Sequence, residues 1–277
     1  MPYLTVDGVE AYYEVHGEGE VALCMGGWGT FCHGKLNDVP RYIRENFRVV
    51  IFDYPGLGES RDDLTVPAST SAYANTGLAV LDDLEVAQAH IVGMVGLGAC
   101  VGQKMALSHP DRVKSLVMTG TWARPDALFA DQLQCFLAVH RNEGFAAFQK
   151  LCAAFSFDAA FYEANRDRIL GSEGAWSALN GHVDAHARLI EACLSHDAYD
   201  YLGSVACPTF VVHANCDAVT PPRLTQPLED RIPLARGYYW EGLTHIIAGR
   251  DQKAKFDQLL AGFYESVTTD ARAPMSR

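Results

Sequence analysis

A glycine-rich run, IVGMVGLGACVG at residues 91–102, has the residue types and spacing of a loop that could do chemistry. Glycines between a strand and a helix can form a loop that holds the phosphates of a dinucleotide. They can also form the sharp turn that presents a catalytic nucleophile. The turn holds no Ser or Asp, and its one cysteine, Cys100, lies late in the run. These two hypotheses predict different surroundings.

The dinucleotide hypothesis fits the surroundings poorly. Gly96 and Gly98 match the first two glycines of that motif, but the third is displaced to Gly102. The motif also needs an acidic residue at the end of the next strand to hold the ribose, and that strand ends in Met-Thr-Gly-Thr at 118–121. Two further strands are expected to precede the run, whereas the motif usually opens its domain. We therefore expect no nucleotide cofactor.

Composition and charge exclude several classes of partner. The chain has 277 residues and a formal net charge of −12, which disfavours nucleic acid or an anionic membrane surface as a partner. We see no secretory signal at residues 1–7, and no apolar run approaches the roughly 20 residues of a membrane span. Eight scattered cysteines without a paired motif are typical of reduced thiols in a cytoplasmic protein without a metal site. Whether the chain forms a homo-oligomer stays open.

Strand and helix patterns alternate on both sides of the glycine-rich run. Short apolar strands bounded by glycines and helices with apolar residues at helical spacing are typical of an α/β fold with a doubly wound, mostly parallel sheet. The expected strands are 4–6, 11–15, 21–25, 48–52, 90–94, 113–118, 209–213 and 237–240, and the expected helices are 36–46, 71–84, 99–108 and 252–266.

The middle of the chain breaks this alternation. Residues 123–202 are helical in pattern, rich in Ala, Phe and His, and lack strand runs. We expect them to form a helical cap inserted between two parts of the α/β core, residues 1–122 and 203–267. The polar residues 268–277 are expected to be a tail.

Five segments, taken in order, make the chain resemble the α/β-hydrolase superfamily. Each segment alone is only moderately specific, but their order and spacing together make the match strong. The resemblance covers residues 3–264. The segments are 6–17, 53–60 (DYPGLGES), 109–113, 212–222 (VHANCDAVTPP) and 242–245 (GLTH). The resemblance implies an α/β-hydrolase fold with an inserted cap.

The resemblance also implies two catalytic residues. Asp217 stands where the family's acid follows its strand, and His245 stands where the family's histidine lies in a later loop. Such a carboxylate holds the histidine in one tautomer and stabilises its protonated form.

The nucleophile position of this family falls inside the glycine-rich run. Counting forward from the preceding helix places it on Val95, and counting back from 109–110 places it on Gly96. We favour Gly96 because Gly96-Leu97-Gly98-Ala99 matches the usual nucleophile-x-Gly-small run, and because glycine best tolerates the strained backbone there. Neither side chain can attack a carbonyl group, so the resemblance implies a member without the serine nucleophile.

The oxyanion hole is expected to be intact because backbone groups form it. By resemblance, the N–H groups of Gly27 and Leu97 are its two donors, with Met25 where the family usually has His. The expected substrate pocket contains Trp28, Cys32, Trp122 and Trp176. Of the cysteines, Cys32 ranks ahead of Cys24 and Cys100 as a candidate for a replacement nucleophile, but we expect all three to be buried. His182 and His186 could form a metal pair, but no carboxylate cluster accompanies them.

A His–Asp dyad facing an oxyanion hole can move protons and stabilise an enolate or oxyanion. This chemistry suits decarboxylation or C–C cleavage, proton abstraction, or hydrolysis by a water that His245 activates. We expect the substrate to be a small apolar or aromatic carbonyl compound. The alternative is a catalytically inert ligand-binding or scaffolding module on the same fold, although such a module has no use for a base and its orienting acid.

Overall fold

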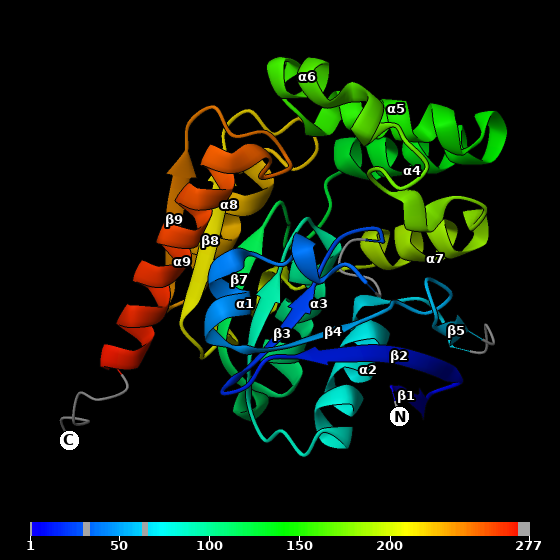
Figure 1. Ribbon diagram of the computed structural model, residues 1–277. Coiled ribbons are helices and arrows are strands. Elements are labelled where there is room, and N and C mark those ends of the chain that lie inside the picture. The colour runs from blue at the N-terminus through cyan, green and yellow to red at the C-terminus, as the bar shows by residue number, and fades with distance from the viewer. Residues whose placement is uncertain (1, 30–33, 63–65, 271–277) are drawn as a thin grey trace.

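A mixed sheet forms the centre of the computed structural model, which describes residues 2–29, 34–62 and 66–270 (Figure 1). Among these residues the strand order is β1-β2-β4-β3-β6-β7-β8-β9, with β5 beside β2. Strand β2 pairs antiparallel with β1, β4 and β5, and all pairs from β4 to β9 are parallel. The strands are β1 Tyr3–Val6, β2 Val9–His16, β3 Val21–Met25, β4 Arg48–Phe52, β5 Arg61–Asp62, β6 Ala89–Gly93, β7 Val113–Thr119, β8 Thr209–Ala214 and β9 Ala235–Trp240.

Helices cover both faces of this sheet. Helices α2 (Thr70–Asp83), α3 (Leu97–Ser108) and α8 (Pro222–Arg231) pack on the face that carries Leu23 and Ile91. Helices α1 (Arg41–Asn46) and α9 (Gly249–Asp270) pack on the opposite face. Strands β3, β6 and β8 are therefore buried along their whole length, which explains their mostly apolar sequences. The doubly wound α/β fold expected from the sequence is confirmed.

Two local expectations differ from the structure. The segment 36–46 forms a 3₁₀ turn, Leu36–Asp38, and the separate helix α1, because Pro40 lies between them and restricts the backbone of the residue before it. Helix α8 was not expected. The sequence did not indicate this helix because it contains Pro227 and is mostly polar. Its few buried residues, Leu224 and Leu228 among them, face the sheet.

Four helices lie between β7 and β8, beyond the carboxyl ends of the parallel strands (Figure 1). They are α4 (Ala127–Glu143), α5 (Phe145–Ser156), α6 (Ala159–Ile169) and α7 (Val183–Leu194), with the 3₁₀ turns Ser177–Leu179 and Tyr199–Ser204. The division of the chain at 122 and 202 stays a prediction. Helix α9 continues to Asp270, so the expected start of the tail at 268 falls inside this helix.

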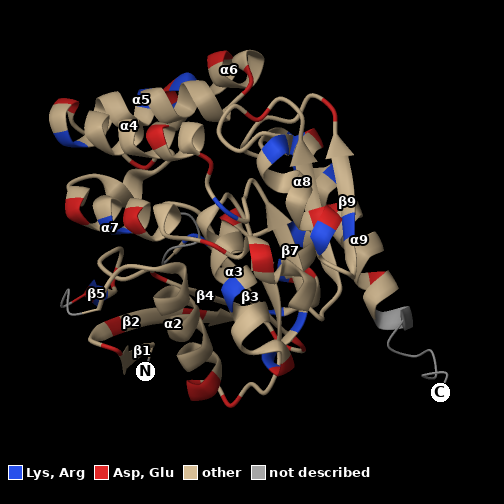
Figure 2. Cartoon of the chain, turned by 180° about the vertical axis from the view of Figure 1, so that it is seen from behind, with Lys and Arg blue, Asp and Glu red and all other residues tan. Residues whose placement is uncertain are grey.

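Residues of both charge signs are spread along the chain in the view from behind. Figure 2 shows Lys and Arg interspersed with Asp and Glu over the helices and loops. In the part of the chain that is described, no helix is both long and apolar enough to cross a membrane.

Candidate active site

The glycine-rich run forms a tight turn between β6 and α3. The turn residues Val95 and Gly96 both have positive φ angles, +55° and +84°, and α3 begins at Leu97. A Cβ atom on Gly93 would overlap the backbone of Ala99, and one on Gly98 would overlap the Met25 carbonyl. The strand, the turn and the start of the helix therefore approach each other so closely that only glycine fits at these two positions.

Val95 stores backbone strain in this turn. A β-branched residue at positive φ is a rare outlier, and such a conformation costs on the order of 1–3 kcal/mol. The turn is held by Thr119 at the end of β7, whose hydroxyl accepts the Val95 N–H at 3.2 Å and whose carbonyl accepts the Gly96 N–H at 3.2 Å. Both residues to which the sequence counts point, Val95 and Gly96, therefore have positive φ angles.

Asp217 and His245 meet at the carboxyl end of the sheet. Asp217 follows β8, and His245 lies in the loop between β9 and α9. His245 Nδ1 lies 2.9 Å from Asp217 Oδ2, and because an ionised carboxylate only accepts hydrogen bonds, Nδ1 carries the proton and donates it. The Nε2 atom is then the basic nitrogen of the neutral ring.

The carboxylate of Asp217 is almost completely buried, with 4% of the residue exposed. Its Oδ1 atom accepts the N–H groups of Val219 and Thr220, each at 2.7 Å, and its Oδ2 atom accepts the Thr220 hydroxyl at 2.8 Å. Burial acts to raise the pKa of Asp217, but the charge and hydrogen bond of His245 together with the Thr220 bonds outweigh it and hold that pKa below its usual value. Asp217 therefore stays ionised beside His245.

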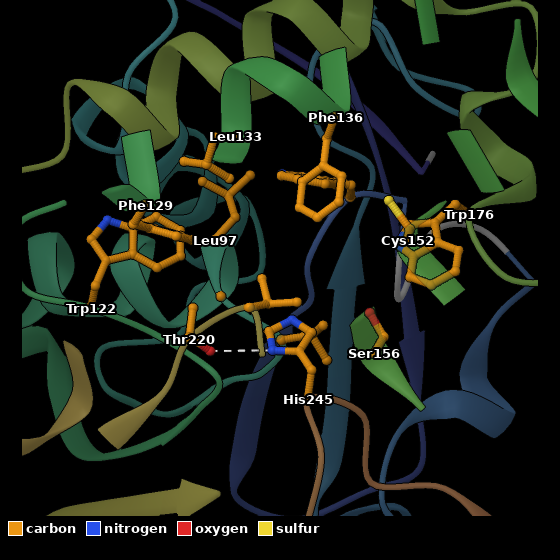
Figure 3. Close-up of a pocket in the computed structure, with 14 residues that line it drawn as sticks. Leu97, Trp122, Phe129, Leu133, Phe136, Cys152, Ser156, Trp176, Thr220 and His245 are labelled. Atoms are coloured by element: carbon orange, nitrogen blue, oxygen red, sulfur yellow. Dashed lines mark hydrogen bonds between the residues drawn. The ribbon is translucent and has the colours of Figure 1, made fainter. Parts of the chain in front are cut away.

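A small, mostly apolar pocket opens beside His245 (Figure 3). Its cavity volume is about 40 Å³. Since one water needs roughly 10–15 Å³ by this measure, the space suits a few waters or one carbonyl group. The lining residues are Trp28, Val95, Gly96, Leu97, Trp122, Phe129, Leu133, Phe136, Cys152, Ser156, Trp176, Val219, Thr220 and His245.

The structure brings most of the sequence-based candidates to this pocket. Trp28, Trp122 and Trp176 line it, as do Val95, Gly96 and Leu97. Gly27 lies directly behind the turn, where a Cβ atom would overlap the Val95 carbonyl. Leu97 is the first residue of α3, so its N–H has no partner within the helix. Cys32 lies outside the described residues.

Three residues near His245 were missed by the sequence reasoning. The Thr220 hydroxyl donates to the Asp217 carboxylate and also lies beside His245 Nδ1. The sequence signal that could have identified Thr220 is a polar residue three positions after an acid in a turn. Gly120 lies against the His245 ring, where an added Cβ would stand 2.9 Å from Cε1. Ser156 ends α5, and its carbonyl accepts the Ile246 N–H at 3.1 Å. Nothing in the local sequence of Ser156 indicates this contact.

Three buried cysteines, Cys24, Cys100 and Cys152, lack the properties of an activated thiol. Burial raises the pKa of the Cys24, Cys100 and Cys152 thiols, which disfavours the reactive thiolate. Cys100 instead contacts the Thr121 hydroxyl at 3.3 Å, away from the pocket.

Of the two cap histidines considered as a metal pair, one is buried and the other is exposed. His186 is fully buried and bonds His140 through their Nδ1 atoms at 3.0 Å, whereas His182 is an exposed residue just before α7 whose side chain makes no capping hydrogen bond. Among the described residues, no group of three or more His, Cys, Asp or Glu side chains could hold a metal ion.

Comparisons with known proteins show what this chain is similar to. Residues 16–245 match the family described as "alpha/beta hydrolase fold". The chain is 31% identical over 240 residues to "Putative carbamate hydrolase RutD" of Caulobacter sp. (strain K31), covering 83% of this chain and 86% of the relative. It is 27% identical over 266 residues to the protein of the same name from Azorhizobium caulinodans, covering 95% and 98%.

A solved structure shows the same fold. The crystal structure of a hydrolase from Pseudomonas aeruginosa PA01 superimposes with a TM-score of 0.80 at 24% identity, covering 96% of this chain and 97% of that one. The family match spans most of the chain, from β2 through the His245 loop. The chain belongs to the α/β-hydrolase fold family.

Proposed function

We propose that this protein is a hydrolase that cleaves a small carbonyl compound of the ester or carbamate class by activating water directly. The observation that carries the proposal is His245, which is anchored by Asp217 at 2.9 Å and lines a pocket beside Val95 and Gly96. These two turn residues offer an isopropyl group and a hydrogen, neither of which can form an acyl-enzyme. A water in the space in front of the turn is then the nucleophile.

The steps follow from the positions of the protein groups. His245 Nε2 takes a proton from the water, whose oxygen attacks the carbonyl carbon and converts the carbonyl oxygen to an oxyanion. Asp217 stabilises the imidazolium that forms, as in the family's catalytic triads. The intermediate collapses, the bond to the alkoxide or amine leaving group breaks, and the imidazolium returns a proton to that group.

The oxyanion is assigned to the N–H groups of Gly27 and Leu97. Gly27 lies against the Val95 carbonyl behind the turn, and Leu97 lines the pocket at the amino end of α3, where the helix dipole favours negative charge. Neither donor depends on the side chain at the turn. Removing one such donor in other enzymes costs about 10²–10³ in rate, so an intact pair is a large part of the expected catalysis.

The relatives support the substrate class. Proteins with 27–31% identity over most of the chain carry the name of a carbamate hydrolase. A carbamate and an ester share the carbonyl carbon and a leaving heteroatom, and both fit the chemistry of a base, an orienting acid and an oxyanion hole. The buried Asp217 carboxylate also favours an enzyme over an inert binding module, since burying a charge without a catalytic use is costly.

The test compares turnover of p-nitrophenyl acetate, a p-nitrophenyl carbamate and a β-keto acid by the wild-type protein and by His245→Ala. His182→Ala is the matched control, because His182 is an exposed histidine outside the pocket. We expect hydrolysis of the ester or the carbamate, lost in His245→Ala and kept in the control. If the β-keto acid is decarboxylated and neither the ester nor the carbamate is hydrolysed, the protein is a lyase and the proposed hydrolysis is wrong. If no compound is turned over, the inert binding module is favoured.

Rapid-quench kinetics with mass spectrometry of the protein tests the water route. Under the proposal no initial burst of p-nitrophenol appears and no acyl adduct forms on the chain. An adduct would overturn direct water attack, and its position would name the nucleophile. Ser156 and Cys152 are the side chains with a hydroxyl or thiol in the pocket wall, apart from Thr220, so Ser156→Ala and Cys152→Ala complete the set.

A further inference from the structure

A second cavity, which we call the outer cavity, opens from the same site. It has a volume of about 750 Å³ and shares Val95, Trp176 and His245 with the inner pocket. Its other walls include Gly29, Lys35 and Asp38, residues of α6 and of the segment after it, and residues that lead into α9. The inner pocket holds about 40 Å³, so any part of a substrate beyond its carbonyl group must extend into the outer cavity.

Basic side chains from three separate parts of the chain line the outer cavity. They are Lys35, Arg168, Arg250 and Lys253, and they exceed the two acidic lining residues, Asp38 and Glu173. The whole chain has a formal net charge of −12, so a wall with an excess of positive charge is unlike the rest of the molecule. The four positions span more than 200 residues of sequence and meet only through the fold.

In the described part of the chain, these four basic side chains form no ion pair. Elsewhere, Arg112 pairs with Asp82, Arg188 with Asp62 and Arg223 with Asp126. By contrast, none of the four basic residues of the outer cavity lies within salt-bridge distance of a carboxylate among the described residues. Arg168 donates to the Asn165 amide oxygen at 3.0 Å and lies over the Phe161 ring, two contacts that leave its charge unneutralised.

The backbone adds positive potential on the same side. The 22-residue helix α9 begins at Gly249, and Gly249, Arg250 and Lys253 in its first two turns line the outer cavity. The amino end of a helix carries a partial positive charge that favours anions nearby. This helix end and the four side chains converge on the cavity that contains His245.

We propose that the outer cavity binds the carboxylate of the substrate, and that the substrate class is therefore a carbonyl compound with a carboxylate tail. This inference rests on the proposed function for the reaction, but the binding site stands on its own observations. The carbonyl group enters the inner pocket beside His245, and the carboxylate lies among Lys35, Arg168, Arg250 and Lys253. No bond is made or broken in the outer cavity.

The experiment measures binding apart from turnover. Adipic acid monoamide, which carries one amide carbonyl and one carboxylate, is titrated against the neutral adipamide of the same length. Tryptophan fluorescence reports binding, because Trp176 lines both cavities, and calorimetry gives the dissociation constants. We expect the monoamide to bind at least about tenfold more tightly than the diamide at low salt, with the preference falling as salt rises.

Variants locate the anion. In Arg250→Gln and in Lys253→Gln we expect about a three- to fivefold loss of affinity for the monoamide, as for a single exposed charge pair, and in the double variant about tenfold or more. Binding of the diamide stays unchanged in all three. Arg166→Gln is the matched control, since Arg166 is exposed on α6 two residues from Arg168 but does not line the outer cavity.

The results separate this inference from the proposed function. Equal binding of the monoamide and the diamide, or equal losses for both in Arg250→Gln, would overturn the carboxylate site. If neutral esters are hydrolysed but no carboxylate preference appears, the proposed function stands and the carboxylate site falls. If the monoamide binds with the expected preference but nothing is hydrolysed, the carboxylate site stands and the reaction is wrong.

Discussion

Replacing Gly120 by alanine should displace the His245 ring without changing its charge. Gly120 follows β7 with a φ of +58°, and a Cβ atom there would lie 2.9 Å from His245 Cε1 and 3.2 Å from Nδ1. Ordinary contact between such atoms begins near 3.4 Å. The ring must therefore move by about 0.5 Å at Cε1, and this movement strains the 2.9 Å bond from Nδ1 to Asp217.

The size of the effect follows from these distances. Alanine at positive φ costs about 1–2 kcal/mol of stability. A displacement of a catalytic group by a fraction of an ångström to 1 Å can cost up to about 10²-fold in rate. We therefore expect Gly120→Ala to unfold at a lower urea concentration and to lose about 10- to 100-fold in kcat/KM on the best ester or carbamate.

Gly242→Ala is a matched control for the cost of placing alanine at a positive φ angle. Gly242 has a φ of +78° and nothing within 4 Å of its added Cβ, so it carries the same kind of strain without the contact to His245. Urea unfolding and steady-state kinetics of both variants separate the two effects. Equal kcat/KM for the two variants would refute the reasoning that Gly120 sets the position of His245.

Three further predictions follow from the same geometry. Asp217→Asn should lower kcat by about 10³–10⁴ with a small change in thermal stability, because the amide no longer selects the Nδ1–H tautomer of His245; steady-state kinetics show this, and a loss under tenfold contradicts it. Gly98→Ala should destabilise the fold by more than about 3 kcal/mol in urea unfolding, since its Cβ would overlap the Met25 carbonyl; a loss below 1 kcal/mol would mean that the turn adapts. Burial lowers the pKa of His186 and His196 to about 3, so below about pH 6.5 the unfolded chain binds more protons than the folded chain, and stability falls as the pH falls. Each histidine should therefore lower the free energy of unfolding by about 2 kcal/mol between pH 7 and pH 5. If urea unfolding of a His186→Gln variant shows the same pH slope as the wild type, the predicted contribution of His186 is wrong.

Residue patterns predicted the sheet, and the family resemblance pointed to Asp217 and His245. Apolar runs such as Val21–Met25 and Ala89–Gly93 are buried on both faces, and burial on both faces is readable from residue type alone. Asp217 and His245 follow strands in the order that the family requires, so their meeting could be anticipated from position. Helix α8 could not, because few of its residues are buried and it contains a proline.

The turn at Val95 and Gly96 shows where local reasoning ended. The sequence showed that no hydroxyl or carboxylate stands there, but it did not show the backbone conformation of the turn. The structure gives two successive positive φ angles, and Thr119, which lies 24 positions after Val95, holds the turn through two hydrogen bonds. Packing between β6, β7 and α3 decided this conformation, because it supplies the bonds that compensate the strain.

By itself, the sequence determined the family, the order of its elements and the chemical types available to the site. Only the tertiary structure placed Gly120 against the His245 ring, ended α5 at Ser156 beside the same loop, and paired His186 with His140. It also brought the four basic side chains of the outer cavity together. The physical reason is that residue patterns report burial within one element, whereas contacts between distant elements depend on how whole helices and loops pack.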